Sequence, residues 1–267
     1  MLKYTFLQPL GEGGISVLEL VSLEDGRTAV LRKLRPLQFF KIGSQIMFRR
    51  GIRIRASLPQ NDGIVASYST GYAGLCPAEL IEYVPGDNLR ILHNKKSAVL
   101  RENIYTILRS AAKALAFVHS CGLQHLDVKP ENFLLKSGGE THVKLTDFDL
   151  TLPAEETGRR KQSGTPAYMA PEQLYGKCSS QASDVFSFCV MCYYLISGHP
   201  PFVGSTQKSS LKRQASERVL ATPLGDMVSN VPRQWEDAIM KGLEKRPEAR
   251  IQNMVAWLKI LGDETNI

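Results

Sequence analysis

Apolar and polar positions follow two different patterns along this chain. In residues 1–84, short apolar runs typical of strands are broken by Gly and Pro, with one helical stretch among them. The strand-like runs lie at residues 4–10, 17–23, 28–34, 64–69 and 78–83. We therefore predict a small β-rich lobe at the N-terminal end of the chain.

Helical periodicity dominates from residue 88 onward. Apolar side chains recur there at steps of three and four, as in Ile104, Ile107, Leu108, Ala111, Leu115 and Val118. The longest strongly apolar run without a charge, Val185–Gly198, has 14 residues, whereas a membrane-spanning helix needs about 20. We therefore predict that this run is a buried helix, and we expect no membrane span.

A turn signal, Val84-Pro85-Gly86-Asp87, separates the two patterns. It indicates an α+β protein of two lobes, with a β-rich lobe over 1–84, a hinge over 85–87 and a larger helical lobe over 88–267. Ligands commonly bind in the cleft between two such lobes.

Composition limits the class of protein. The 267 residues are 43% hydrophobic and 22% charged, which is the balance of an ordinary globular protein and excludes a disordered tail, a collagen-like repeat and a small disulfide scaffold. The N-terminus lacks a signal-peptide core and the five cysteines are scattered, so we expect reduced thiols and a cytoplasmic location. Cys189 and Cys192 form a C-x-x-C inside an apolar run, and we interpret them as small core side chains.

The whole chain has a net charge of +7. Its basic residues are concentrated in one stretch. Residues 26–61 contain no Asp or Glu and nine basic side chains, namely Arg27, Arg32, Lys33, Arg35, Lys41, Arg49, Arg50, Arg53 and Arg55. A nucleic-acid patch is one interpretation. Because aromatic residues for base stacking are not interleaved with the charges, we favour a solvated helix face plus a strand and expect no nucleic-acid partner.

A glycine-rich turn is the first candidate for chemistry. Gly11-Glu12-Gly13-Gly14 lies between two predicted strands, and glycine lets backbone N–H groups approach a phosphate closely. A plain hairpin turn explains the same residues, so this feature alone does not indicate a nucleotide.

A second candidate is the segment from His125 to Asn132 together with Asp147. Asp127 and Lys129 are two residues apart in a predicted loop, and Asp147 follows an apolar strand. The amide oxygen of Asn132 and the carboxylate of Asp147 are oxygen ligands that suit Mg²⁺ bound to phosphates. A separate carboxylate beside a lysine suits the positioning of a hydroxyl nucleophile near a phosphoryl group.

Over nearly its whole length the chain resembles the eukaryotic-type protein kinase family. The motifs that carry the resemblance are 125–132, Asp147-Phe148-Asp149, 164–172, 184–188, 198–202 and 243–250. The resemblance implies a bilobal kinase fold, ATP and Mg²⁺ as cofactors, and a protein substrate with a Ser or Thr hydroxyl.

The resemblance also implies roles for individual residues. Asp127 would accept the proton of the substrate hydroxyl, and Lys129 would neutralise the transferring phosphoryl group and, with Thr165, mark a Ser/Thr-directed enzyme. Asn132 and Asp147 would hold Mg²⁺. Residues expected at the nucleotide are Gly11, Glu12, Gly13, Gly14, Leu18, Val30, Arg32, Glu82, Val84, Asn132, Leu134 and Asp147, with Ile81 as the gatekeeper.

Two further roles implied by the resemblance are structural. Glu172 and Arg250 would form a buried ion pair that fixes the peptide-binding loop. Asp184 would hydrogen-bond the backbone of the His125 loop.

Four departures from the family pattern affect the catalytic assignment. Arg32 stands where the family has a lysine, unless a strand bulge presents Lys33 instead. Gly51 falls where a helix glutamate should pair with that lysine, and no acid lies nearby in the sequence. Asp149 replaces the glycine after Asp147-Phe148, and we hypothesise that it substitutes for the missing glutamate by pairing with Arg32 or with the basic helix face (Arg50, Arg53, Arg55).

The fourth departure is Leu126, which stands where an arginine commonly precedes the catalytic aspartate. That arginine helps to bind an activating phosphate, so a phosphate at Thr157 or Ser163 should matter less here.

Three functions remain open at this point. The favoured one is an active Ser/Thr protein kinase with an atypical nucleotide clamp, because Asp127, Lys129, Asn132, Asp147 and Thr165 are all present. The second is a pseudokinase, a nucleotide-binding or nucleotide-free scaffold that docks or regulates a protein partner. The third, a basic module for nucleic acid or an anionic surface, has only net charge in its support.

Overall fold

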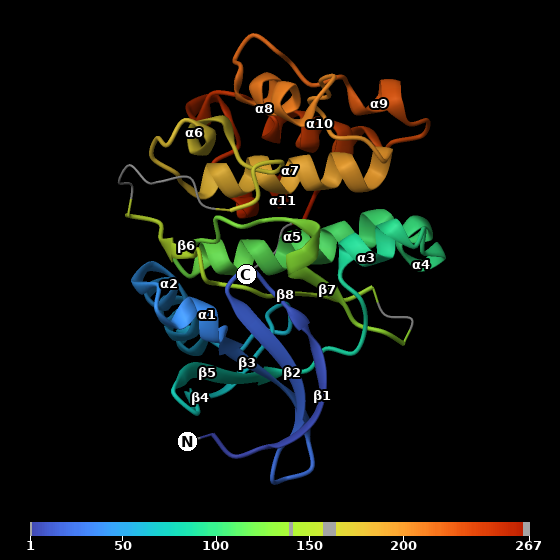
Figure 1. The fold of residues 1–267 in the computed structure, drawn as a ribbon. Helices are drawn as coiled ribbons and strands as arrows, with labels where there is room; N and C mark the ends of the chain where they lie inside the picture. The colour runs from blue at the N-terminus through green and yellow to red at the C-terminus, as the bar shows by residue number, and fades with distance from the viewer. Residues whose placement is uncertain (1, 139–140, 157–163, 264–267) are drawn as a thin grey trace.

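The computed structural model describes residues 2–138, 141–156 and 164–263 and shows two lobes, one built on a sheet and one built on helices (Figure 1). The predicted α+β bilobal architecture is confirmed. Thr157 and Ser163, the two candidate phosphorylation positions, lie outside the described residues.

The smaller lobe contains a five-stranded antiparallel sheet in the order β1-β2-β3-β5-β4. Its strands are β1 Thr5–Glu12, β2 Ser16–Ser22, β3 Thr28–Leu34, β4 Ser67–Ala73 and β5 Cys76–Glu82. Alternating side chains of the sheet bury two apolar clusters, because successive residues of a strand point to opposite faces. One cluster holds Val21, Ala29, Leu31, Ala78 and Leu80, and the other holds Val30, Val65, Ile81 and Val84.

The prediction of a strand over 64–69 is wrong at its start, because β4 begins only at Ser67. Ile64 instead forms a parallel bridge with Leu145 and belongs to the core of the helical lobe. The N–H of Val65 donates to the carbonyl oxygen of Leu145 at 3.0 Å. The apolar pair that suggested a strand therefore joins the two lobes.

Two helices cover the small lobe, α1 Pro36–Phe39 and α2 Ile42–Ser57. The interpretation of the helix face as solvated is wrong for Arg55 of α2, which is only 3% exposed. Arg32 of β3, predicted to lie at the nucleotide, is 4% exposed. Since a buried charge is costly without a partner, these two residues need acids from elsewhere in the chain.

The larger lobe is organised around two long helices, α5 Ile104–Ser120 and α7 Gln181–Ser197. Both were predicted, and α7 ends at Gly198, whose φ of +76° is the left-handed conformation that glycine accepts. Cys189 and Cys192 are buried in the core of this lobe, as predicted. The other helices are α3 Leu89–Asn94, α4 Ala98–Glu102, α6 Pro171–Leu174, α8 Gln207–Ala215, α9 Leu224–Met227, α10 Arg233–Gly242 and α11 Met254–Ile260.

Within the described ranges, no helix combines the length and the apolar character that crossing a membrane requires.

Short strands lie on the face of the larger lobe that meets the sheet. β6 Leu123–Gln124 pairs with β9 Leu152–Pro153, and β7 Phe133–Leu135 pairs with β8 Val143–Leu145. The loops that follow β6 and β8 carry the predicted catalytic and metal-binding residues.

The connection between the lobes is tied to β7. The N–H of Leu135 donates to the carbonyl of Asp87 at 3.0 Å, and the N–H of Ser137 donates to the carbonyl of Pro85 at 2.7 Å. Gly86 has a φ of +142°, and a Cβ at this position would overlap the carbonyl oxygen of Leu135. This close approach explains the glycine in the turn signal.

Candidate active site

The loop after β6 is held in place by Asp184, at the start of α7. One carboxylate oxygen of Asp184 accepts the N–H of His125 at 2.6 Å, and the other accepts the N–H of Leu126 at 2.7 Å. Leu126 has a φ of +65°, an unfavourable conformation for a residue with a side chain. Asp184 is 1% exposed, so two charge-assisted bonds in the interior stabilise this backbone. The contacts predicted for Asp184 are confirmed.

Asp127, Lys129 and Asn132 converge in this loop. The Nζ of Lys129 lies 2.7 Å from Oδ2 of Asp127. The amide nitrogen of Asn132 donates to the main-chain oxygen of Asp127 at 2.8 Å and lies 3.2 Å from its Oδ2. Because the nitrogen end of the Asn132 amide is engaged with Asp127, its oxygen end points the other way.

Asp147 stands beside this loop, just after β8. The N–H of Thr146 donates to the carbonyl of Asn132 at 3.0 Å, which ties the end of β8 to the loop. The Asp147 side chain is 38% exposed. Burial would raise its pKa, but the positive charges of Arg32 and Lys129 outweigh burial, so the pKa of Asp147 is lowered. The carboxylate is therefore ionised at neutral pH.

Apolar side chains predicted at the nucleotide come together between the sheet and β7. Val30, Ile81 and Val84 form one buried cluster, with Leu18 and Leu134 packed against it. The Glu82 carboxylate does not face this cluster directly, since it accepts the N–H of Ala66 at 3.1 Å and pairs with Lys144 at 2.9 Å.

The glycine-rich segment is the hairpin turn between β1 and β2. The N–H of Gly13 donates to the carbonyl of Ser16 at 2.8 Å, and a Cβ on Gly14 would meet nothing within 4 Å. Gly11 has a φ of +149°. The Glu12 carboxylate lies 2.6 Å from the guanidinium of Arg35.

Arg32, and not Lys33, occupies the inward position on β3. The pairings of β3 with β2 and β5 run without a register shift, so no bulge presents Lys33. Lys33 instead pairs with Glu19 of β2 at 2.6 Å, with 27% of its side chain exposed.

Asp149 pairs with Arg32, as hypothesised. Nη2 of Arg32 donates to Oδ2 of Asp149 and lies 3.6 Å from Oδ1 of Asp147. Arg50, on α2, donates to the main-chain oxygen of Asp149 at 2.7 Å. Burial raises the pKa of Asp149 to about 6 even though Arg32 opposes the shift.

Gly51 of α2 faces Asp149 directly. A Cβ at Gly51 would lie 2.9 Å from Cα of Asp149 and still closer to its carboxylate. The helix position that lacks its glutamate is therefore the position against which the extra aspartate packs. The loop after β8, and not α2, therefore supplies the carboxylate of Asp149 that pairs with Arg32.

We predict that Gly51→Ala destabilises the protein although alanine favours a helix by about 1 kcal/mol. The added methyl group has no room, and such overpacking costs about 1–3 kcal/mol. Gly43→Ala is the matched control in the same helix, because a Cβ there meets nothing within 4 Å. Chemical denaturation should show Gly51→Ala less stable than wild type and Gly43→Ala equal or more stable. A stabilised Gly51→Ala would contradict the close packing.

Sequence reasoning missed Glu79 and the position of Arg55. Glu79 lies on β5, opposite Arg32, and its Oε1 accepts Nη1 of Arg32 at 2.8 Å. Nε of Arg55 lies 3.6 Å from Oε2 of Glu79. The sequence did contain one signal of a buried acid, because Glu79 is the single charged residue inside the apolar run Cys76–Ile81.

The segment that begins at Gly164 lies over the loop that holds Leu126 and Asp127. A Cβ on Gly164 would lie 3.5 Å from Oδ1 of Asp127. The segment ends at Glu172, whose carboxylate pairs with Arg250 at 2.8 and 3.1 Å and accepts the hydroxyl of Ser183 at 2.7 Å. The predicted buried pair of Glu172 and Arg250 is confirmed.

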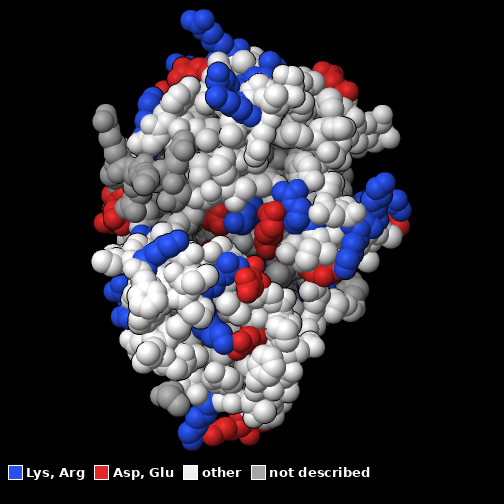
Figure 2. All heavy atoms as spheres, viewed as in Figure 1, with Lys and Arg blue, Asp and Glu red and all other residues white. Residues whose placement is uncertain are grey.

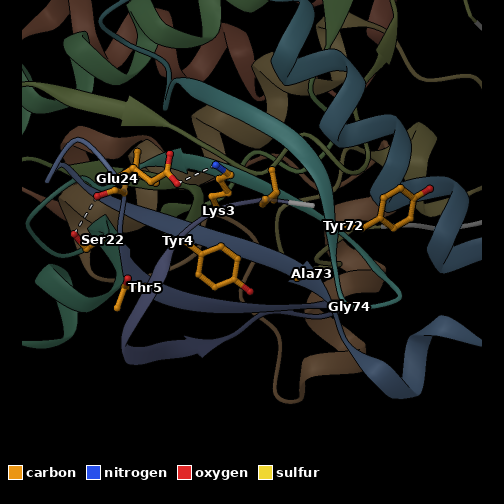
Figure 3. Close-up of a pocket in the computed structure, with 10 residues that line it drawn as sticks. Lys3, Tyr4, Thr5, Ser22, Glu24, Tyr72, Ala73 and Gly74 are labelled. Carbon is orange, nitrogen blue, oxygen red and sulfur yellow. Dashed lines mark hydrogen bonds and ion pairs between the residues drawn. The ribbon is translucent and has the colours of Figure 1, made fainter.

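Charged side chains of both signs lie close together on the face where the lobes meet, as Figure 2 shows. A separate pocket of about 510 Å³ opens on the small lobe, lined among others by Lys3, Tyr4, Glu24 and Tyr72 (Figure 3). None of the predicted site residues lines that pocket.

Comparison with known proteins gives a consistent result. The protein kinase domain model matches residues 4–259. The serine/threonine-protein kinase PknB of Mycolicibacterium smegmatis is 29% identical over 260 residues, covering 94% of this chain and 41% of that protein. Aurora kinase C of Mus musculus is 29% identical, covering 91% of this chain and 86% of that kinase. The serine/threonine-protein kinase PknL of Mycobacterium tuberculosis is 32% identical, covering 78% and 52%. The chain thus spans about half or less of the two mycobacterial relatives.

Proposed function

Because the chain belongs to the eukaryotic-type Ser/Thr protein kinase family, we propose that it transfers the γ-phosphoryl group of ATP to a serine or threonine hydroxyl of a protein. The observation that carries this proposal is the convergence of Asp127, Lys129 and Asn132 beside the ionised carboxylate of Asp147. Phosphoryl transfer depends mainly on positioning and on charge stabilisation, and these four side chains supply both.

Asp127 is proposed to orient the substrate hydroxyl and to accept its proton. Its carboxylate is 9% exposed and is held by Lys129 on one side and by the Asn132 amide on the other. Lys129 is proposed to stabilise the negative charge of the transferring group. Thr165 lies next to Gly164, whose position above Asp127 fits a segment that presents a peptide hydroxyl.

The residues present fit a nucleotide and Mg²⁺. The apolar cluster of Val30, Ile81 and Val84, with Leu18 and Leu134, suits the two faces of an adenine ring. The main chain of Glu82 and Val84 is proposed to bind the adenine edge, and that of Gly11, Glu12, Gly13 and Gly14 to bind the phosphates.

Asn132 and Asp147 would hold the metal through oxygen atoms. Among the residues that the structure describes, no group of three or more His, Cys, Asp or Glu side chains is arranged to hold a metal ion. Two protein ligands plus phosphate oxygens is the arrangement expected of Mg²⁺, which is usually bound through one or two carboxylates and substrate phosphates. Bound Mg²⁺ supplies charge neutralisation at the phosphates.

Arg32 is proposed to replace the usual lysine as the cation at the nucleotide phosphates. Its guanidinium is planar and forms paired bonds, so it can bridge two carboxylates where a lysine ammonium acts as a point charge. Here it bridges Glu79 and Asp149. This arrangement is the atypical clamp.

A pseudokinase is the second candidate, and the same guanidinium favours it. Both Nη atoms of Arg32 already bind protein carboxylates, so a phosphate would have to share the group with them. In that case the chain would bind a nucleotide weakly or not at all and would act on a regulatory protein partner.

The two candidates separate in an assay of labelled phosphate transfer from ATP to a generic basic protein. An active kinase should label the protein in the presence of Mg²⁺, and phosphoamino-acid analysis should show phosphoserine and phosphothreonine without phosphotyrosine. The reaction should be run with Mg²⁺ and with Mn²⁺. If labelling with both metals is no higher than in a reaction without the enzyme, the pseudokinase is the function that remains. Labelled phosphotyrosine would contradict the assigned specificity.

A further inference from the structure

Glu79 is the most deeply buried carboxylate at the site. Its side chain is 0% exposed in the middle of β5, between apolar neighbours. Burial of an unpaired carboxylate is strongly unfavourable. Glu79 therefore depends on its two cationic neighbours, Arg32 and Arg55.

The contact with Arg32 fixes the direction of the guanidinium. Arg32 and Glu79 are register partners on adjacent strands, so their backbones are held by the sheet. Nη1 of Arg32 is bound to Glu79 at 2.8 Å while Nη2 binds Asp149 and lies 3.6 Å from Asp147. Two carboxylates on different nitrogen atoms prevent rotation of a planar fork.

Arg55 provides the second positive charge near Glu79. Its Nε lies 3.6 Å from Oε2 of Glu79, and its guanidinium lies over the Phe148 ring at 5.3 Å. Only 1% of the Arg55 side chain is exposed. Arg32 and Arg55 thus place two positive charges beside the carboxylates of Glu79 and Asp149.

We propose that Glu79 is the positioning residue of Arg32, and that it takes the place in this chain of a carboxylate on the neighbouring helix. The inference rests on the proposed function, since it assigns Arg32 to the nucleotide phosphates. Because Glu79 lies in the same sheet as Arg32, the direction of the guanidinium is set without any acid from α2. Arg55 places a second positive charge beside the Glu79 carboxylate.

Glu79→Gln is the direct test, since it keeps the shape of the side chain and removes the charge. We expect the Kd for Mg·ATP, measured by titration calorimetry, to rise by roughly 10- to 100-fold, which is the usual contribution of a well-placed hydrogen bond to a charged group. The matched control is Glu19→Gln, which alters the Glu19–Lys33 pair on the other face of the same sheet. This control should bind Mg·ATP as wild type does. Unchanged binding by Glu79→Gln would overturn the proposal.

A combined variant separates positioning from simple charge balance. If Glu79 served only to neutralise Arg55, then Glu79→Gln together with Arg55→Met would restore wild-type Mg·ATP binding. We expect the double variant to recover thermal stability relative to Glu79→Gln but to keep its weak binding. Restored binding would contradict the positioning role.

A readout without nucleotide keeps this inference distinct from the proposed function. In ¹⁵N NMR spectra of arginine side chains, the Nη protons of Arg32 should be resolved in wild type because rotation of the group is restrained. They should be averaged in Glu79→Gln and resolved in Glu19→Gln. If wild type bound no Mg·ATP, the proposed function would fail while the restraint of Arg32 could still be observed. Averaged Arg32 signals in wild type would refute the inference itself.

Discussion

Replacing Asp127 with asparagine should lower the rate of phosphoryl transfer by about 10²- to 10⁴-fold, the usual contribution of a positioned general base. The amide keeps the size of the side chain but cannot accept a proton from the substrate hydroxyl. The Km for ATP should change little, because Asn132 and Asp147 remain in place. Initial rates of labelled phosphate transfer at saturating ATP, compared with wild type, measure the effect.

Two controls make the Asp127→Asn result interpretable. The melting temperature should stay near that of wild type, since asparagine can still accept a hydrogen bond from Lys129. Asp25→Asn alters an exposed acid that pairs with Arg27 on the surface, and it should leave the rate unchanged. A variant at Asp127 that retained more than about a tenth of wild-type activity would remove this residue from the catalytic role.

Replacing Arg32 with methionine should be the most destabilising change at the site. Glu79 and Asp149 would both remain buried without their shared cation, and removal of one partner from a buried ion pair costs about 3–5 kcal/mol. Nucleotide binding should be lost together with stability. Urea denaturation monitored by fluorescence measures the free energy of unfolding, and calorimetry measures ATP binding.

The neighbouring residue offers a matched control for Arg32→Met. Lys33 is also a basic residue of β3 with a carboxylate partner, but its pair with Glu19 is partly exposed. Lys33→Met should cost about 1 kcal/mol, the value of an ordinary hydrogen bond, and should leave ATP binding intact. Equal losses of stability and of ATP binding in the two variants would contradict a special role for the buried pairs of Arg32 with Glu79 and Asp149.

Much of the fold could be predicted from the sequence because local signals agreed with it. The apolar run that became α7 was long, without charge and closed by Gly198. Strand β3 coincides with its prediction at Thr28–Leu34. The start of β4 was misplaced because Ile64 belongs to the core of the other lobe and bridges to Leu145, while Val65 packs with Val30 and Ile81. An apolar pair in the sequence does not reveal which partner covers it.

The candidate site was predictable where a motif carries its own spacing, as Asp127, Lys129 and Asn132 do. The pairing of the buried charges at the site was harder to predict from the sequence. Arg55 resembled a solvated residue because the usual rule places arginine at the surface, and its partner Glu79 lies on a strand 24 residues later in the chain. The pairing of Asp149 with Arg32 was found because one acid was missing and another had appeared.

Titration calorimetry with ATP, in the presence and absence of Mg²⁺, tests most directly whether Asn132 and Asp147 hold a metal-bound nucleotide between the lobes. The account predicts that Mg²⁺ strengthens ATP binding to the wild-type chain and that Asp147→Asn abolishes this strengthening while metal-free ATP still binds. ATP binding that ignores Mg²⁺, or an equal Mg²⁺ response in Asp147→Asn, would contradict it.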